Sequence, residues 1–183
     1  GNTFAQEVDF LNTGDVTLGD ETGDTFAFNG GLNFTGGAAS NVAATITAAA
    51  GDANFGTGGV TLTDAGASVT TIGGNIIFGE NINGALDLTL DSGAAGTIAV
   101  AGITTVDNLV ITNSGGAIFT GAVAATTDIT ITDTTDATTV SFLNAVTARD
   151  LVTFGEAYLV SMTGTGNTFT LGVDFLNTGD VTL

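Results

Sequence analysis

The chain opens with GNTFAQEVDFLNTGDVTL (Gly1–Leu18) and ends with GNTFTLGVDFLNTGDVTL (Gly166–Leu183). Fifteen of the eighteen positions match when Gly166 is aligned with Gly1. Only three positions differ, where Ala5, Gln6 and Glu7 are replaced by Thr170, Leu171 and Gly172. Self-similarity at a fixed period is the signature of a repeat architecture. We therefore interpret residues 1–165 as one long repeat and residues 166–183 as the start of the next tandem copy, continuous with the same rod.

A shorter period runs inside the long one, because pairs of apolar residues spaced by two recur along the chain. The pairs are Val8/Phe10, Leu32/Phe34, Ile76/Phe78, Ile98/Val100, Val140/Phe142, Val160/Met162 and Val173/Phe175, and Phe55 and Phe119 occupy the second slot after an alanine. Most intervals between successive second slots are roughly 21 residues long, whereas the last one, from Met162 to Phe175, is much shorter. The sequence therefore predicts about eight short units, of which the last is truncated or irregular.

A second apolar segment follows each pair. Examples are VTL (16–18), LDLTL (86–90) and DITIT (128–132). Alternation with a period of two is typical of a strand with one buried face, so the threonines between apolar neighbours are expected to point outward. Clusters of Gly, Asn, Asp and Ser such as DSGAAG (91–96) separate the strands and tolerate the positive φ angles of tight turns.

A unit of this length cannot bury its apolar face alone, whereas a stack of units can. The chain contains no proline, which agrees with strands that pair on both edges. The sequence therefore predicts an all-β fold, a parallel β-helix or solenoid of about eight coils of roughly 21 residues. We expect one buried stack, formed by Phe10, Phe34, Phe55, Phe78, Val100, Phe119, Phe142, Met162 and Phe175.

The two long copies are expected to occupy the same structural place, displaced along one axis. Val8/Phe10 and Val173/Phe175 should point inward in both copies, and residues 2–6 should be poorly packed. Leu171 follows Phe169 at strand spacing, so we expect it to point into the core.

The charge is strongly one-sided, with 19 carboxylates against one cation and no His, giving a formal net charge of −18. A nucleic-acid partner is not expected, because nothing neutralises phosphates, and neither is an anionic membrane surface or membrane insertion. The chain has no Cys, so disulfides and thiolate sites are excluded. No signal peptide or apolar spanning run is visible, and we interpret the chain as a mature form or a fragment.

Catalysis is not expected. Enzymes that use this fold need a cation-rich cleft, a histidine or a tuned carboxylate pair, and a Ser-His-Asp set is impossible here. A pair of carboxylates acting as in a glycosidase is the one catalytic alternative that the composition leaves open.

The densest acidic segment is GDVTLGDETGD, which contains Asp15, Asp20, Glu21 and Asp24. Carboxylate oxygens in a glycine-bearing loop suit Ca²⁺, so these four residues are the candidate metal site, with diffuse attraction of counterions as the alternative. The spacing matches neither an EF-hand loop nor a calcium β-roll. Asp128, Asp133 and Asp136 form a second acidic group around a strand.

Two further features have weaker interpretations. Ranks of outward threonine suggest an ice-binding face, although only Thr130 and Thr132 form a clear pair in the sequence. Arg149 is expected to pair with Asp150 or with a carboxylate on an adjacent coil, without a functional role.

Three phrases carry a family resemblance, IFTGAV (118–123), SFLNAV (141–146) and ALDLTLDSGAAGTI (85–98). They resemble the β-strand repeats of filamentous-haemagglutinin-like exoproteins and autotransporter-type adhesins. The resemblance covers most of the chain. It implies a right-handed parallel β-helix, secretion from a bacterium, and a role in adhesion or in a surface filament.

Two hypotheses about the function therefore remain. The first is a non-catalytic structural component of an extracellular filament, sheath or surface layer, whose partners are copies of itself. The second is an adhesin shaft that binds a glycan or a protein of a cell surface. The aromatic residues fall mostly on inward slots, which favours the structural interpretation.

Overall fold

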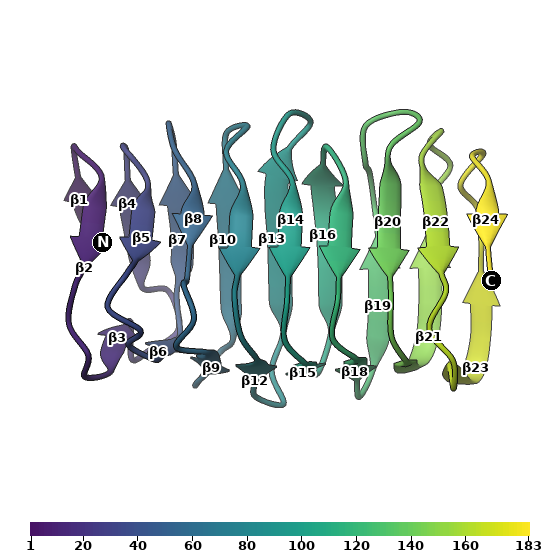
Figure 1. Ribbon diagram of the computed structural model, residues 1–183, viewed down its shortest axis with the longest axis horizontal. Helices are drawn as coiled ribbons and strands as arrows, with labels where there is room; N and C mark the ends of the chain where they lie inside the picture. Colours follow the sequence, from purple (N-terminus) through teal and green to yellow (C-terminus); the bar gives the residue numbers. More distant parts are fainter.

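Three short strands form each turn of the chain, and the turns stack along one axis (Figure 1). The computed structural model describes all 183 residues. It contains 24 strands and no helix. Every pairing between strands is parallel and joins residues one coil apart, which confirms the predicted parallel β-solenoid. In Figure 1 the strands nearer the viewer run down and those behind run up as the coils advance, so the coil is right-handed.

The strands make three faces, which the chain visits in the order face 1, face 2, face 3. Face 1 contains β1 (Asn2–Phe4), β4 (Thr25–Phe28), β7 (Thr45–Ala48), β10 (Ala67–Thr71), β13 (Leu88–Gly93), β16 (Leu109–Ser114) and β19 (Asp128–Ile131). Face 2 contains β2 (Val8–Phe10), β5 (Leu32–Phe34), β8 (Ala53–Asn54), β11 (Ile76–Phe78), β14 (Ile98–Val100), β17 (Ala117–Phe119), β20 (Thr139–Phe142), β22 (Leu159–Met162) and β24 (Val181–Thr182). Face 3 contains β3 (Val16–Leu18), β6 (Ser40–Val42), β9 (Val60–Leu62), β12 (Ile82–Asn83), β15 (Thr104–Val106) and β18 (Val123–Ala125).

Two long strands run through a corner and serve two faces. The first half of β21 (Val146–Thr153) pairs with β18 on face 3, and its second half pairs with β19 on face 1. The next strand, β23 (Thr168–Asp174), follows β21 in the same way. Faces 1 and 3 are therefore joined into one 15-stranded sheet, while face 2 is a separate nine-stranded sheet.

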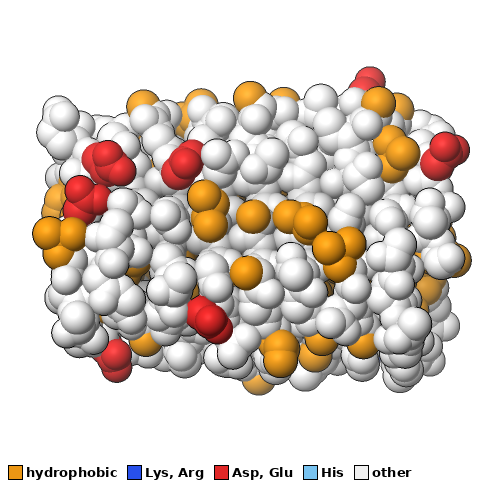
Figure 2. Space-filling model, in the orientation of Figure 1, with side chains coloured by type: hydrophobic (Ala, Val, Ile, Leu, Met, Phe, Trp, Pro, Cys, Tyr) orange, Lys and Arg blue, Asp and Glu red, His pale blue; other side chains and the backbone are white.

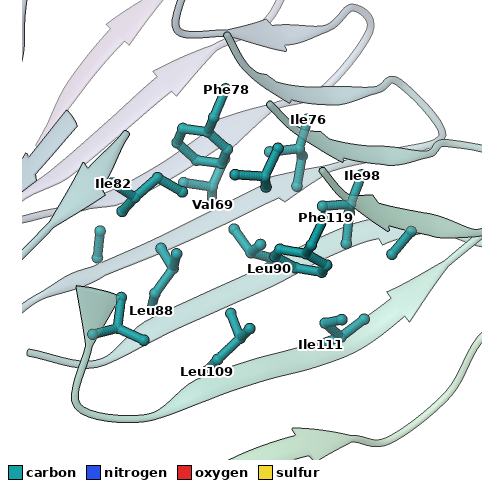
Figure 3. Close-up of a cluster of buried hydrophobic side chains, with 14 of the residues drawn as sticks. Val69, Ile76, Phe78, Ile82, Leu88, Leu90, Ile98, Leu109, Ile111 and Phe119 are labelled. Carbon is teal, nitrogen blue, oxygen red and sulfur yellow. The ribbon is translucent and has the colours of Figure 1, made fainter. Parts of the chain in front are cut away.

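Apolar alternation builds the core. On β10 every second residue is buried, and Val69 lies in register with Ile46 on one side and Leu90 on the other. Figure 3 shows how residues of all three faces meet, with Val69, Leu90 and Ile111 of face 1 opposite Ile76 and Ile98 of face 2. One continuous cluster of 39 buried residues results, and stacking alone creates it, because no single coil encloses its own apolar side chains.

The predicted aromatic stack lies on the inner side of face 2. Phe34, Phe55, Phe78, Val100, Phe119, Phe142 and Met162 are all at most 3% exposed, and Phe10 in the first coil is half-buried. Ring centroids lie 4.6 Å apart for Phe55 and Phe78 and 5.2 Å apart for Phe119 and Phe142. Val100 is in register with Phe78 and with Phe119, so it interrupts the aromatic stack without leaving the column.

Phe175 does not belong to this stack, so that part of the prediction is wrong. Residue Asp174 pairs with Val152 of β21 on face 1, and Phe175 follows it at the end of that face. The column on face 2 ends instead beside β24. The cause is the short interval from Met162 to Phe175, which is too short for the three faces of a full coil.

Buried hydroxyl groups hold the corner between faces 1 and 2. Thr71, Ser92, Ser114, Thr134 and Thr153 are at most 2% exposed. Thr153 lies between Val152 and Phe154, so the prediction that threonines between apolar neighbours point outward is wrong at this position. The oxygens of these hydroxyl groups bond the turning backbone, as when Ser92 Oγ donates to Gly96 O at 2.9 Å and Thr134 Oγ1 donates to Asp133 O at 2.7 Å. Buried polar groups in a close-packed interior need such partners, so hydroxyl side chains replace apolar ones where the chain bends.

The two copies of the 18-residue segment lie on different faces, which contradicts the expectation that they would be equivalent. In the first copy, Asn2–Phe4 pairs on face 1, Val8–Phe10 on face 2 and Val16–Leu18 on face 3. In the second copy the corresponding residues pair on face 3, on face 1 and on face 2. Each strand of the second copy therefore lies one face earlier, in the order in which the chain visits the faces, than the corresponding strand of the first copy. Val8, Phe10, Val173 and Phe175 nevertheless all pack against the core, and residues 2–6 are exposed, as predicted.

Leu171 points outward and is 71% exposed, so the prediction that it enters the core is wrong. The pairing of β21 with β23 shifts register between Ala148 and Asp150, where Thr170 and Leu171 together oppose one residue. An extra residue of this kind reverses the alternation of side chains. Strand spacing from Phe169 therefore does not carry through to Leu171.

The Phe119 side chain provides a test of the stack. We expect Phe119→Ala to lower the free energy of unfolding by about 3–5 kcal/mol, because a fully buried ring leaves a cavity that the rigid coils cannot close. Leu143→Ala is the matched control, since Leu143 is 43% exposed in the next corner. Urea denaturation followed by circular dichroism measures both. Equal losses in the two variants would contradict the packing described here.

Candidate functional site

The four candidate calcium ligands lie at two different corners, at opposite ends of a strand of face 3. Asp15 precedes β3 at one corner, whereas Asp20, Glu21 and Asp24 follow β3 at the other. Within the second group the backbone N–H of Asp20 donates to Asp24 Oδ2 at 3.1 Å. Nowhere does the chain arrange three or more Asp, Glu, His or Cys side chains to hold a metal ion. Calcium binding at these four residues stays a prediction.

The second acidic group is divided as well. Asp128 begins β19 at the corner between faces 3 and 1, while Asp133 and Asp136 lie beyond the other end of that strand. Arg149 binds Asp128 through two hydrogen bonds, from Nε at 3.1 Å and from Nη2 at 2.7 Å. The partner is a carboxylate one coil away, as expected for this lone cation. The carboxylate raises the pKa of Arg149, so the guanidinium stays charged.

A ladder of Asp and Asn side chains runs along the corner between faces 3 and 1. Asn108 Nδ2 donates to Asp87 Oδ1 at 2.8 Å, and the N–H of Asp128 donates to Asn108 Oδ1 at 3.1 Å. Arg149 then continues the ladder by binding Asp128. Sequence reasoning missed this ladder, although the spacing of 21, 20 and 21 residues between its members equals the coil length and could have identified it.

Two threonines hold Asp107 beside this ladder. Thr126 Oγ1 and Thr127 Oγ1 both donate to Asp107 Oδ1 at 2.5 Å. These hydrogen bonds, first that of Thr126 and then that of Thr127, hold the pKa of Asp107 below its ordinary value, because they favour the charged carboxylate. The coil therefore keeps this carboxylate ionised in acid conditions where a free aspartate is protonated.

We expect Thr126→Val to raise the pKa of Asp107 toward its ordinary value, since one of its two donors is lost. The folded-state pKa is below the unfolded one, so Asp107 stabilises the fold at neutral pH, and this contribution disappears as the pH falls through the folded-state value. Thr126→Val should weaken that acid dependence. An NMR titration of the carboxyl carbon measures the pKa, and Thr105→Val on the outer side of face 3 is the control. A pKa that does not move would contradict the assignment.

A shallow groove of about 250 Å³ follows the same corner nearer the first coils. Small residues such as Ala43, Ala44 and Gly66 form its floor, and Asp87 is the only charged residue that lines it. The groove contains neither a second carboxylate nor a cation, so it offers no pair of groups for acid–base chemistry.

The outer side of face 1 carries two hydroxyl ranks that are longer than the sequence indicated. Thr25, Thr45, Ser68 and Thr89 lie in register on successive coils, and Thr47 and Thr70 form a second rank beside them. Further along, Val110 and Val152 take the place of threonine in the first rank, and Asp91 follows Thr70 in the second. The ice-binding alternative thus has a partial array, interrupted in both ranks.

The outer side of face 2, which faces the viewer in Figure 2, changes character along its length. Asn54 Nδ2 donates to Asn33 Oδ1 and Asn33 Nδ2 to Asp9 Oδ1, both at 2.9 Å. The next residues in this rank are Ile77, Ala99 and Ile118. Figure 2 accordingly shows acidic groups toward the first coils and a row of hydrophobic side chains across the middle.

The last coil is fixed by a cluster around Thr153. Thr153 Oγ1 accepts hydrogen bonds from the N–H groups of Leu176 at 2.7 Å and Asn177 at 3.0 Å. Asn177 Nδ2 donates to Tyr158 O at 3.0 Å. The Tyr158 ring is fully buried, and its hydroxyl donates to Ile131 O at 2.8 Å. Burial of the ring raises the pKa of Tyr158, so the phenol stays neutral.

This cluster joins the second copy of the repeat to the first, and sequence reasoning missed it. Asn177 corresponds to Asn12 of the first copy, and in each copy the side-chain amide donates to the carbonyl two residues on, Gly14 O or Gly179 O. Asn167, which corresponds to Asn2, accepts a hydrogen bond from the N–H of Val146 at 2.9 Å. The repetition of both asparagines in the two copies was the available signal.

Thr153→Val should loosen this joint selectively, because it leaves the N–H groups of Leu176 and Asn177 without their acceptor. An unpaired buried donor costs about 1–3 kcal/mol, so we expect hydrogen-exchange protection of these two amides to fall by about ten- to a hundredfold. Thr130→Val, an outward threonine of face 1, is the control. Protection that is unchanged in Thr153→Val would show that the hydroxyl does not hold the last coil.

Comparison with protein-family models, with curated proteins and with solved structures found no match to this chain. None of its segments forms a helix of the length and apolarity that crossing a bilayer requires.

Proposed function

We propose that this chain is a non-catalytic structural segment of an extracellular bacterial filament, sheath or surface layer, built from tandem β-solenoid repeats. Its partners are further copies of the same repeat. The faces carry hydroxyl, amide and carboxylate ranks rather than a cleft with convergent reactive groups, which supports a structural role.

The observation that carries the proposal is the joint at residues 166–183. These residues begin a second copy of the long repeat, and they continue the solenoid by backbone pairing with the coil beneath them. Thr178 N–H donates to Glu156 O at 2.8 Å and Val160 N–H donates to Asp180 O at 3.0 Å, so the pairing extends beyond the strands themselves. A repeat that pairs with its own successor in this way makes a rod whose length is set by copy number.

The charge of the chain is compatible with such a rod. Carboxylates lie mainly on the outer ranks and corners, and the single ion pair joins Arg149 to Asp128. A net charge of −18 favours solubility and opposes lateral aggregation of rods. The location outside the cell rests on the resemblance to bacterial exoproteins.

An adhesin shaft is the second candidate, and the exposed apolar row on face 2 is the observation that favours it. Ile118 is 40% exposed there, although its neighbours Ile77 and Ala99 are covered in part. Binding of the purified chain to a glycan array, abolished by Ile118→Asp, would identify this function.

Arrays of one, two and three copies of residues 8–172 test the structural proposal, because this 165-residue unit keeps Thr170, Leu171 and Gly172 at every junction. With a rise of about 4.8 Å per coil, each added copy should lengthen the particle by about 37 Å at constant cross-section. Small-angle X-ray scattering measures both dimensions. The control is a two-copy array with a flexible Gly-Ser linker between the copies, which should scatter as two jointed rods. If the uninterrupted array also scatters as jointed or globular particles, the proposal is wrong.

A further inference from the structure

We propose that each copy of the repeat docks on the end of the preceding copy turned back by one face, a third of a turn about the rod axis. The partner surface is the coil formed by residues 146–162, and the occupant is the first coil of the next copy. This inference rests on the proposed function and adds the geometry by which successive copies join.

The pairing pattern is the first observation. Val8 of the first copy pairs with Leu32 on face 2, whereas the corresponding Val173 pairs with Leu151 on face 1. Thr17 pairs with Asn41 on face 3, whereas the corresponding Thr182 pairs with Ser161 on face 2. All three strands of the segment move together, so the shift applies to the whole coil and not to one misplaced strand.

Chain length is the second observation. Within the repeat, residues in register on neighbouring coils are between 19 positions apart, as for Ile98 and Ala117, and 24 positions apart, as for Val8 and Leu32. The interval from Met162 to Phe175 is little more than half of such a coil. That length is enough for two faces but not for three, so Phe175 cannot return to the face of Met162. The long repeat therefore contains eight coils less one face.

The local chemistry of the second copy fits its new place. Gly172 lies in register with Asp150, and a Cβ at Gly172 would lie 3.3 Å from Asp150 Oδ1. The corresponding residue of the first copy is Glu7, which at this position would bring a second carboxylate against Asp150. Directly opposed like charges destabilise neighbouring strands. The glycine removes this conflict, so one of the three substitutions between the copies is explained by the face on which the second copy docks.

The turn that closes the segment works at either corner. The LNTGD turn lies between faces 2 and 3 in the first copy and between faces 1 and 2 in the second, yet the amide of Asn12 or Asn177 makes the same bond to the glycine carbonyl. On each face the strand needs two inward side chains with an outward one between them, and both VDF and VTL have this pattern. The residues that the two copies share therefore do not restrict the segment to one face.

The consequence is a rod in which identical groups appear on successive faces. The pair of Arg149 and Asp128, for example, lies beside face 1 in one copy and moves to the next position around the axis in the following copy. A given face presents the same group once in every three copies. A ligand that lies along one face therefore meets a period of three copies, not one.

Disulfide trapping decides whether the second copy is turned by one face or placed like the first copy. The chain has no natural cysteine, so only the introduced pair can form a disulfide. Paired residues on adjacent coils lie about 4.8 Å apart, within the range of a disulfide. If the second copy is turned, Ser161 faces Thr182, and Ser161→Cys/Thr182→Cys should oxidise. If both copies were equivalent, Ser161 would face Asp174 instead, and Ser161→Cys/Asp174→Cys should oxidise.

Ser141→Cys/Ser161→Cys is the positive control, because these two outward positions pair within the first copy in either arrangement. We expect Ser161→Cys/Thr182→Cys to cross-link to the same extent as this control and Ser161→Cys/Asp174→Cys to stay reduced, as measured by mass spectrometry of the whole 183-residue chain. The reverse result, or a cross-linked control with neither test pair linked, overturns the proposal. The length of the multi-copy arrays is a separate readout, so a rod of the expected length with the reverse cross-link leaves the structural function standing and removes only the rotation.

Discussion

Backbone hydrogen bonding between coils is the constraint on which the rest of the structure depends. Each strand pairs only with its equivalents one coil before and one coil after, so a residue that points inward must lie in register with inward residues on both sides. The columns of Phe, Val, Ile and Leu follow from this requirement, and so does the absence of a core in any single coil. Where coil length changes, the corners absorb the difference and the columns stay intact.

The same constraint brings side chains of like kind together on the outside, and it makes a chain of net charge −18 workable. Stacked carboxylates would repel one another directly, but amides separate them, as in Asp87, Asn108 and Asp128, and hydroxyl groups satisfy Asp107. An asparagine can donate to a carboxylate on one side and accept from a backbone N–H on the other. Hydrogen bonds from amide and hydroxyl groups therefore stabilise most of these carboxylates, and the one salt bridge, from Arg149, lies where Asp128 and Asp150 are in register.

The fold class, the coil length and most of the inward column could be predicted from the sequence, because the apolar slot at Phe34, Phe78 or Phe142 depends only on alternation and coil length. The placement of the second copy was less accessible. The short interval from Met162 to Phe175 indicates that the second copy is displaced by one face. This follows only when a coil is known to have three faces, and the apolar pairs in the sequence do not show that number. The outward turn of Leu171 depends on a bulge, and the separation of Asp15 from Asp24 depends on which corner each occupies. Such features depend on the bulges and corners, where the sequence has no periodic pattern from which they could be predicted.

The direction of the inter-coil hydrogen bonds has a mechanical consequence. They run along the rod axis, so tension applied between the two ends of the chain loads them in series and detaches one coil at a time. Each coil that detaches releases roughly 70 Å of extended chain. The rod would therefore yield under load by unwinding in steps, lengthening many times over while the coils still wound keep their shape.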